Sequence, residues 1–112
     1  MADTLGTFEQ AVLLAVVRLG DDAYGRAIRN EAQDRLRRDV AAGAVHATLE
    51  RLEQKALIVS HLGPGTAVRA GRPRRYYRLL PLGLRALNDT RHTIDALWRG
   101  IKWPIAKAMA GA

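Results

Sequence analysis

The chain has 112 residues, of which 48% are hydrophobic and 26% charged, a balance typical of one globular domain with a modest core. It contains no cysteine, which excludes disulfides, thiolate metal sites and cysteine nucleophiles. Its formal net charge of +7 suits a polyanionic partner, because each phosphate neutralised by Lys or Arg releases a condensed counterion. A merely basic soluble protein can carry the same total, so the placement of the charge decides between these interpretations.

The N-terminal segment shows no sign of a membrane span or an export signal. The apolar run AVLLAVV ends at Arg18, far short of the roughly 20 residues that cross a bilayer. Asp3 stands where a signal peptide would carry basic residues. We therefore expect a cytoplasmic protein with no membrane partner.

Two helices are expected before residue 40. Thr7 followed by Gln10 fits a capping box, and the apolar residues that follow recur at helical spacing. The pair Asp21–Asp22 offers a cap for a second, amphipathic helix that begins near Tyr24 and runs out somewhere between Leu36 and Arg38. The first helix is apolar on most sides, which indicates a central core helix, with a dimer interface as the alternative.

A third helix is predicted from the spacing of Val45, Leu49 and Leu52, which places them on one buried stripe. The exposed side is rich in small residues, which let a helix backbone approach the major groove of DNA closely. Its expected DNA-facing residues are Gly43, His46, Ala47 and Arg51. A plain solvent face, with alanines supplying helix propensity, remains the alternative.

A basic hairpin follows. Apolar residues at 57–59 predict a strand, GPG at 63–65 breaks it, and alternation at 76–79 predicts the return strand. Five arginines fall among the ten residues 69–78. A tip of this charge density beside a helix suited to a groove indicates phosphate or minor-groove contact, whereas an isolated run of charge is usually only solvated. The residues expected to make this contact are Arg69, Arg72, Arg74 and Arg75.

A last helix is expected to begin at Pro81 and to end or kink near Trp103, before Pro104. Its apolar residues are spaced alternately four and three, as in a coiled-coil seam. A second copy of the chain is the expected partner, with packing back onto its own domain as the alternative. The expected dimer interface comprises Leu84, Leu87, Ile94, Leu97, Trp98 and Ile101.

The sequence gives little support to an enzymatic function. His46, His61 and His92 lack metal-ligand spacing, and Ser60, the chain's only serine, sits in no nucleophile elbow. The segment GPGT lacks the lysine and the helix start of a phosphate-binding loop. We therefore expect neither catalysis nor a cofactor.

Four segments together resemble the PadR family of bacterial transcriptional regulators, specifically its smaller type with a short single C-terminal helix. They are LGTFEQAVLLAV (5–16), DDAYGRAI (21–28), GAVHATLERLEQKALI (43–58) and GRPRRYYRLLPLGLRAL (71–87). The resemblance implies a mainly α fold with a small β-hairpin. A winged helix-turn-helix domain would span residues 1–79 and a C-terminal dimerisation helix residues 80–112.

The resemblance also implies a function. The chain would be a sequence-specific, homodimeric regulator of double-stranded DNA, most often a repressor at an inverted-repeat operator. Some small members bind flat, apolar effectors at the dimer interface beside an aromatic residue of the last helix, which makes Trp98 a candidate contact. Trp98 as a plain seam residue is the alternative. A winged-helix dimer that serves only as a protein-interaction or effector-binding module, without sequence-specific DNA readout, is the alternative function.

This sequence departs from the family pattern at five positions. His46 replaces a common tyrosine of the third helix, and Ala41 replaces its serine cap. Arg37 and Ala56 stand where glycine often ends the second helix and follows the third, and Leu80 replaces the threonine that caps the last helix. We expect these departures to change individual contacts more than the fold.

Overall fold

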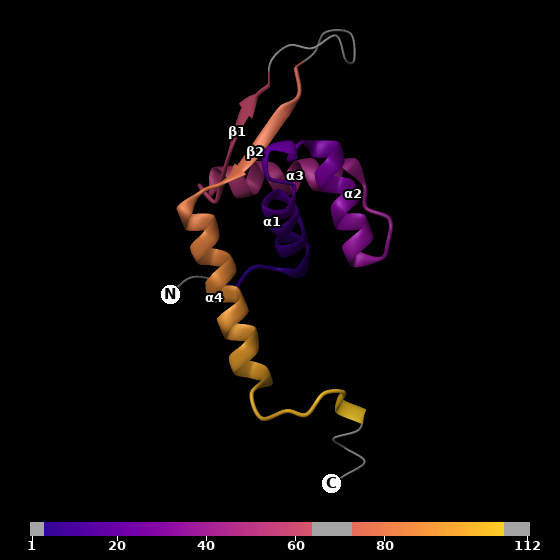
Figure 1. Ribbon diagram of the computed structural model, residues 1–112, viewed down its shortest axis with the longest axis vertical. Helices are drawn as coiled ribbons and strands as arrows, with labels where there is room; N and C mark the ends of the chain where they lie inside the picture. Colours follow the sequence, from indigo (N-terminus) through magenta and orange to yellow (C-terminus); the bar gives the residue numbers. More distant parts are fainter. Residues whose placement is uncertain (1–3, 64–72, 107–112) are drawn as a thin grey trace.

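The computed structural model describes residues 4–63 and 73–106 and shows a helical bundle from which a hairpin and a long helix project in opposite directions (Figure 1). The elements are α1 (Thr7–Leu19), the 3-10 turn η1 (Gly20–Asp22), α2 (Gly25–Leu36), α3 (Ala42–Gln54), β1 (Ile58–Leu62), β2 (Arg75–Leu79) and α4 (Pro81–Trp98). This order of three helices, a hairpin and a further helix is the predicted winged helix-turn-helix.

The core lies where α1, α2, α3 and the base of the hairpin meet. The predicted stripe of α3 is buried there, with Val45, Leu49 and Leu52 each at most 2% exposed. Because α1 buries Val12, Leu13, Ala15 and Val16 in its middle turns, it is the core helix that its sequence indicates. Its side chains Leu14 and Val17 nevertheless remain open to solvent.

Two predicted helix caps are wrong. The N-cap of α1 is Gly6, whose N–H donates to Glu9 Oε1 (3.1 Å), while Thr7 is already helical. The side-chain amide of Gln10 instead donates to the carbonyl of Leu5 (3.0 Å). The pair Asp21–Asp22 forms η1, so it stops short of α2, whose N-cap Tyr24 makes no side-chain capping bond.

The departures from the family pattern have visible backbone consequences. Arg37 (φ 56°) and Ala56 (φ 61°) both adopt the left-handed conformation that disfavours residues with a Cβ atom. Ala41 and Leu80 are the N-caps of α3 and α4, and neither makes a side-chain capping bond. The chain therefore keeps the expected helix ends without the residues that usually stabilise them.

The hairpin is antiparallel and anchored to the bundle. Ser60 pairs with Tyr77, and Leu62 with Arg75. The Tyr77 N–H donates to the carbonyl of Ala23 (2.8 Å), so β2 also bonds to the loop between η1 and α2. These bonds fix the base of the wing relative to the helix-turn-helix.

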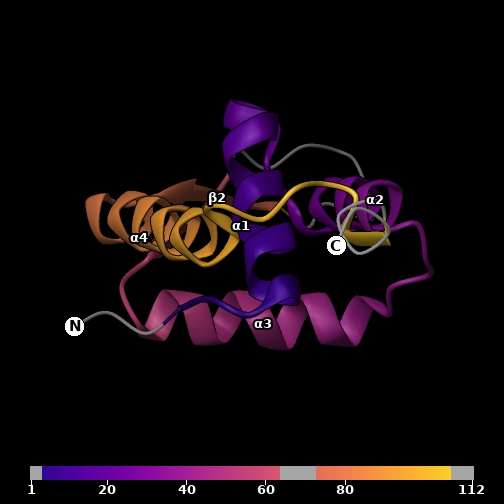
Figure 2. The ribbon, with the colours of Figure 1, turned by 90° about the horizontal axis from the view of Figure 1, so that it is seen from below.

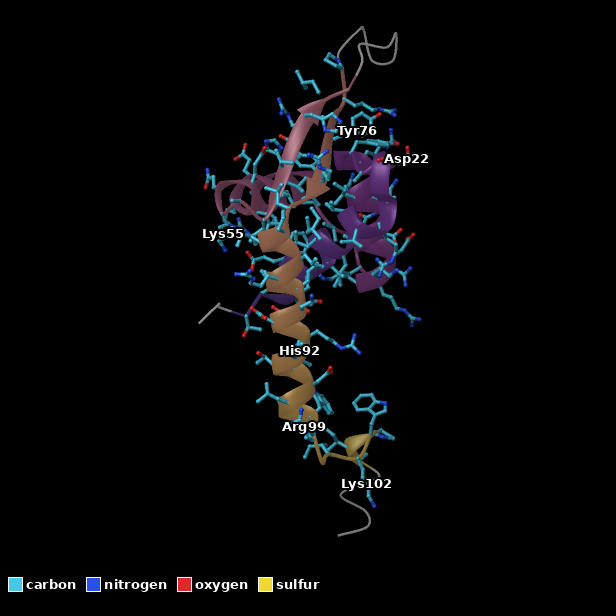
Figure 3. All side chains as sticks on the ribbon, turned by 60° about the vertical axis from the view of Figure 1, so that its left-hand side comes forward. Asp22, Lys55, Tyr76, His92, Arg99 and Lys102 are labelled. Carbon is cyan, nitrogen blue, oxygen red and sulfur yellow. The ribbon has the colours of Figure 1, made fainter. Side chains whose placement is uncertain are left out.

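The first half of α4 packs on the bundle, and the second half projects away from it (Figures 1 and 3). Gly83, Ala86 and Thr90 are buried, and Thr90 Oγ1 accepts a bond from the Leu5 N–H (3.1 Å). Figure 3 places His92 and Arg99 along the projecting part, where both are exposed. This projection contributes to a longest dimension of 63 Å.

The expected end of the last helix is also wrong. Pro81 does begin it, but α4 ends at Trp98, well before Pro104. Gly100 follows with φ 84°, a conformation that stops an α-helix. Ile101 therefore lies beyond the helix and cannot belong to a continuous helical seam.

Candidate nucleic-acid interface

The outer face of α3 lies at one edge of the molecule, uncovered by any other described element (Figure 2). Gly43, Ala47 and Glu50 are exposed on this face. Nothing in the described part of the chain lies within 4 Å of a Cβ atom built on Gly43. The face therefore has the low profile that close approach to a groove requires.

His46 and Arg51 lie on opposite flanks of that face. His46 lines a hollow toward α2 and pairs with Glu50 (Nε2–Oε1 3.0 Å), both side chains being well exposed. Arg51 donates to Thr48 Oγ1 (3.1 Å), on the side facing the start of α1. The two predicted base contacts are thus about 140° apart around the helix axis, given 100° per residue, and a role for Arg51 remains a prediction.

The Arg51 flank also carries an ion pair between helices. Lys55 Nζ lies 3.3 Å from Glu9 Oε2. Burial alone would raise the pKa of Glu9, but the Gly6 N–H bond and the charges of Lys55 and Arg51 hold it below its ordinary value. The carboxylate consequently ties the start of α1 to the end of α3.

The hollow between α2 and α3 has a volume of about 440 Å³ and opens beside His46. Arg26 and Arg29, both at the start of α2, line it together with Gly25. Arg29 Nε is engaged by the carbonyl of Val40 (2.6 Å), whereas Arg26 is exposed. Helix starts attract anions, so Arg26 is suited to hold a phosphate beside α3.

Sequence reasoning did not select Arg26 as a site residue. The sequence predicts the second helix only as amphipathic and assigns this arginine no role. The predicted start near Tyr24 already places Arg26 in the first turn of α2. The missing information was the hollow between α2 and α3, which depends on how the two helices pack and not on a local pattern.

The structure describes two of the four predicted wing arginines, Arg74 and Arg75. Arg69 and Arg72 lie outside the described residues. The guanidinium of Arg74 stands over the ring of Tyr24, 4.2 Å from its centroid. Arg75 instead donates through Nη1 to Ser60 Oγ (3.0 Å), so the two diverge.

The predicted dimer residues of α4 are unequal. Leu84, Leu97 and Trp98 are 53%, 74% and 42% exposed. Ile94 is half-buried, and Leu87 packs partly against the chain's own core. The start of α4 therefore packs on its own domain, while much of its apolar face stays open, and pairing with a second copy remains a prediction.

The indole of Trp98 meets that of Trp103 edge to face, with centroids 5.5 Å apart.

Within the described residues, no three His, Cys, Asp or Glu side chains are grouped to hold a metal ion. No helix in that part of the chain is long and apolar enough to cross a membrane.

A groove-compatible helix beside a basic, anchored hairpin defines a winged helix-turn-helix DNA-binding protein. Residues 13–89 match the transcriptional regulator PadR-like family, and the chain belongs to that family. The class is accordingly a DNA-binding transcription regulator and not an enzyme.

Solved structures agree with this assignment. A PadR family transcription regulator from hypervirulent Clostridium difficile R20291 is 26% identical, with a TM-score of 0.66 over 93% of this chain and 99% of that one. A PadR family transcriptional regulator from Eggerthella lenta DSM 2243 is 27% identical, with a TM-score of 0.62 over 80% of this chain and 76% of that one.

Bordetella bronchiseptica BpsR, whose DNA binding is regulated by 6-hydroxynicotinic acid, shares the fold. It is 16% identical, with a TM-score of 0.62 over 98% of this chain and 78% of that one. A comparison with curated proteins found no match.

Proposed function

We propose that this protein is a homodimeric, sequence-specific repressor in the cytoplasm that binds an inverted-repeat operator in double-stranded DNA. The observation that carries the proposal is the low, exposed face of α3 next to a hairpin face that presents Arg75. In this arrangement a helix enters the major groove while the wing contacts phosphates.

The contacts divide by position. Gly43 and Ala47 lie nearest the groove, and Glu50 and His46 offer an acceptor and a ring to base edges. Glutamate accepts from the amino group of cytosine, so the His46–Glu50 pair favours sites with cytosine. Arg26 and Arg75 hold phosphates on either side of α3. Arg51 extends the contact on the other flank.

Dimerisation rests on the open face of α4. Residues 1–79 would form the reading domain and residues 80–112 the dimerisation segment. Leu84, Leu97 and Trp98 expose apolar area that a second copy would bury, aided by the half-buried Ile94 and Leu87. Ile101 would reach the partner only from beyond the helix.

A small apolar effector is part of the proposal. The edge-to-face pair of Trp98 and Trp103 presents ring faces at the end of α4, where a flat compound can stack. The effect of 6-hydroxynicotinic acid on BpsR supports a flat aromatic effector, although that acid is itself polar. A bound compound would change the spacing of the two reading helices and so release DNA.

The test is a selection of random-sequence duplexes by the purified protein, read by sequencing at physiological salt. We expect enrichment of an inverted repeat whose half-sites lie about one helical turn apart. Binding without an enriched motif would contradict sequence-specific readout. A protein that binds no DNA would instead be an interaction module, the alternative function.

A further inference from the structure

Three side chains connect the reading helix to the wing. Ser60, in β1, donates to Glu53 Oε2 of α3 through both its N–H (3.1 Å) and its hydroxyl (2.7 Å). The same hydroxyl accepts a bond from Arg75 Nη1 of β2 (3.0 Å). The chain Glu53–Ser60–Arg75 thus joins three elements through one oxygen atom.

The direction of these bonds is fixed by the chemistry of a hydroxyl group. A serine hydroxyl has a single proton, which Ser60 donates in its hydrogen bond to Glu53. The lone pairs of the Ser60 oxygen are therefore available to accept a bond from the guanidinium. Bonds to a charged partner are stronger than neutral ones. Glu53 therefore orients the Ser60 hydroxyl, and the hydroxyl orients Arg75.

The hairpin register explains why the three side chains meet. Ser60 pairs with Tyr77, and Leu62 with Arg75, so these residues share one face of the hairpin. Tyr77 is buried against α3 on that face, and burial raises its pKa although the nearby Arg75 charge opposes this. The face is therefore turned toward the reading helix, unlike that of Arg78.

We propose that Ser60 is a positioning residue that, held by Glu53, fixes the guanidinium of Arg75 for a phosphate contact at the junction of α3 and the wing. This inference rests on the proposed DNA-binding function. Among the described residues, Arg75 donates one of its several N–H groups to Ser60, and further donors of the same guanidinium can reach a phosphate. Pre-ordering a long side chain reduces the entropy lost when DNA binds.

The hydrogen bonds of Ser60 also separate the Glu53 carboxylate, which DNA phosphates would repel, from the Arg75 guanidinium, which they would attract. Glu53 carries a negative charge beside a surface meant for phosphates, yet its Oε2 is covered by both Ser60 donors. Arg75 is exposed outside them. The Glu53–Ser60–Arg75 chain of hydrogen bonds consequently places the Arg75 guanidinium outside the Glu53 carboxylate.

The experiment measures operator affinity across a salt series for the full chain and for Ser60→Ala, Ser60→Thr, Arg75→Ala and the Ser60→Ala/Arg75→Ala double variant. We expect Ser60→Ala to weaken binding about fivefold or more. Its log–log salt slope should fall toward that of Arg75→Ala, because each phosphate contact contributes about 0.9 to the slope. Ser60→Thr keeps the hydroxyl and should restore both quantities.

The double variant tests whether Ser60 acts through Arg75. In the Arg75→Ala background, removing the hydroxyl should change affinity by less than twofold, the non-additivity expected of coupled residues. Arg78→Ala is the matched control, since Arg78 lies in the same strand on the other face, and its slope should equal that of the unchanged protein. Thermal unfolding of each variant separates a loss of folded protein from a loss of contact.

The outcomes distinguish the two proposals. If the unchanged protein selects an operator but Ser60→Ala keeps its affinity and salt slope, the positioning role is wrong and the repressor proposal stands. If Ser60→Ala and Arg75→Ala effects simply add, Ser60 does not act through Arg75. If the unchanged protein binds no DNA, both proposals fall.

Discussion

A Cβ atom on Gly83 of α4 would collide with the main-chain carbonyl oxygen of Leu57, the residue that precedes β1. The same carbonyl accepts a bond from the Leu80 N–H (3.0 Å), so it has little room to move. The last helix therefore crosses the base of the wing at a distance that only glycine permits.

We expect Gly83→Ala to destabilise the protein by about 1–3 kcal/mol, because α4 must shift to admit the methyl group. Gly25→Ala, in the first turn of α2, is the control, since nothing described lies within 4 Å of its Cβ position. That change should be neutral or stabilise by up to about 1 kcal/mol. Urea unfolding measures both, and equal effects would contradict the close crossing.

Ala56→Gly should stabilise the protein by about 1 kcal/mol. Ala56 holds φ 61°, where a Cβ atom is disfavoured and glycine is not. Ala47→Gly, at an exposed position inside α3, should instead destabilise by roughly 0.5–1 kcal/mol. Chemical unfolding of the two variants should thus give opposite signs, and a loss of stability in both would show that Ala56 is unstrained.

Much of this fold follows from sequence because apolar periodicity is a local property. The buried stripe of Val45, Leu49 and Leu52 and the strand pair of the wing needed no tertiary information. Pro81 at the start of α4 likewise acts through its own fixed φ.

The remaining features depend on contacts or on competing local signals. The apolar spacing of the last helix continues past its real end, and Gly100 stops it before Pro104. The Glu53–Ser60–Arg75 bonds join residues whose proximity depends on hairpin register, so no local pattern announces them. The start of α4 packs closely because Gly83 lies against the carbonyl of Leu57. This contact between distant parts of the chain cannot be predicted from the local sequence of α4.

Glu9→Gln should lower the stability of the protein near neutral pH, and the stability of the variant should depend less on pH in the acid range. The folded-state pKa of Glu9 lies below its ordinary value of 4.5, so the unfolded chain binds more protons between these two values. Its contribution is therefore complete above about pH 5 and is lost as pH falls through the folded-state pKa. At pH 7 the variant should lose about 1 kcal/mol of unfolding free energy, which lowers the midpoint of thermal unfolding by a few degrees.

Thermal unfolding between pH 3 and 7 measures this effect. The difference between the unchanged protein and Glu9→Gln should shrink as the solution is acidified. Asp95→Asn is a suitable control, because Asp95 pairs with Arg91 on the exposed part of α4. A Glu9 difference that stays constant with pH would contradict a lowered pKa.

Leu84→Glu should dissociate the proposed dimer while leaving the fold intact. Leu84 and Leu82 are similarly exposed, at 53% and 49%, yet they lie about 160° apart around α4. Only Leu84 lies on the seam, so Leu82→Glu is the matched control. Sedimentation equilibrium should give a monomer for Leu84→Glu and a dimer for Leu82→Glu; two dimers would place the interface elsewhere.

Arg26→Ala should weaken operator binding and reduce the log–log salt slope by about 0.9, the value for one lost phosphate contact. The prediction follows from its exposed place in the first turn of α2, at the mouth of the hollow beside His46. Arg85→Ala removes the same charge from the exposed side of α4 and should leave the slope unchanged. Because the two variants have equal net charge, a difference between their slopes reports position and not total charge. Equal slopes would mean that the start of α2 makes no phosphate contact.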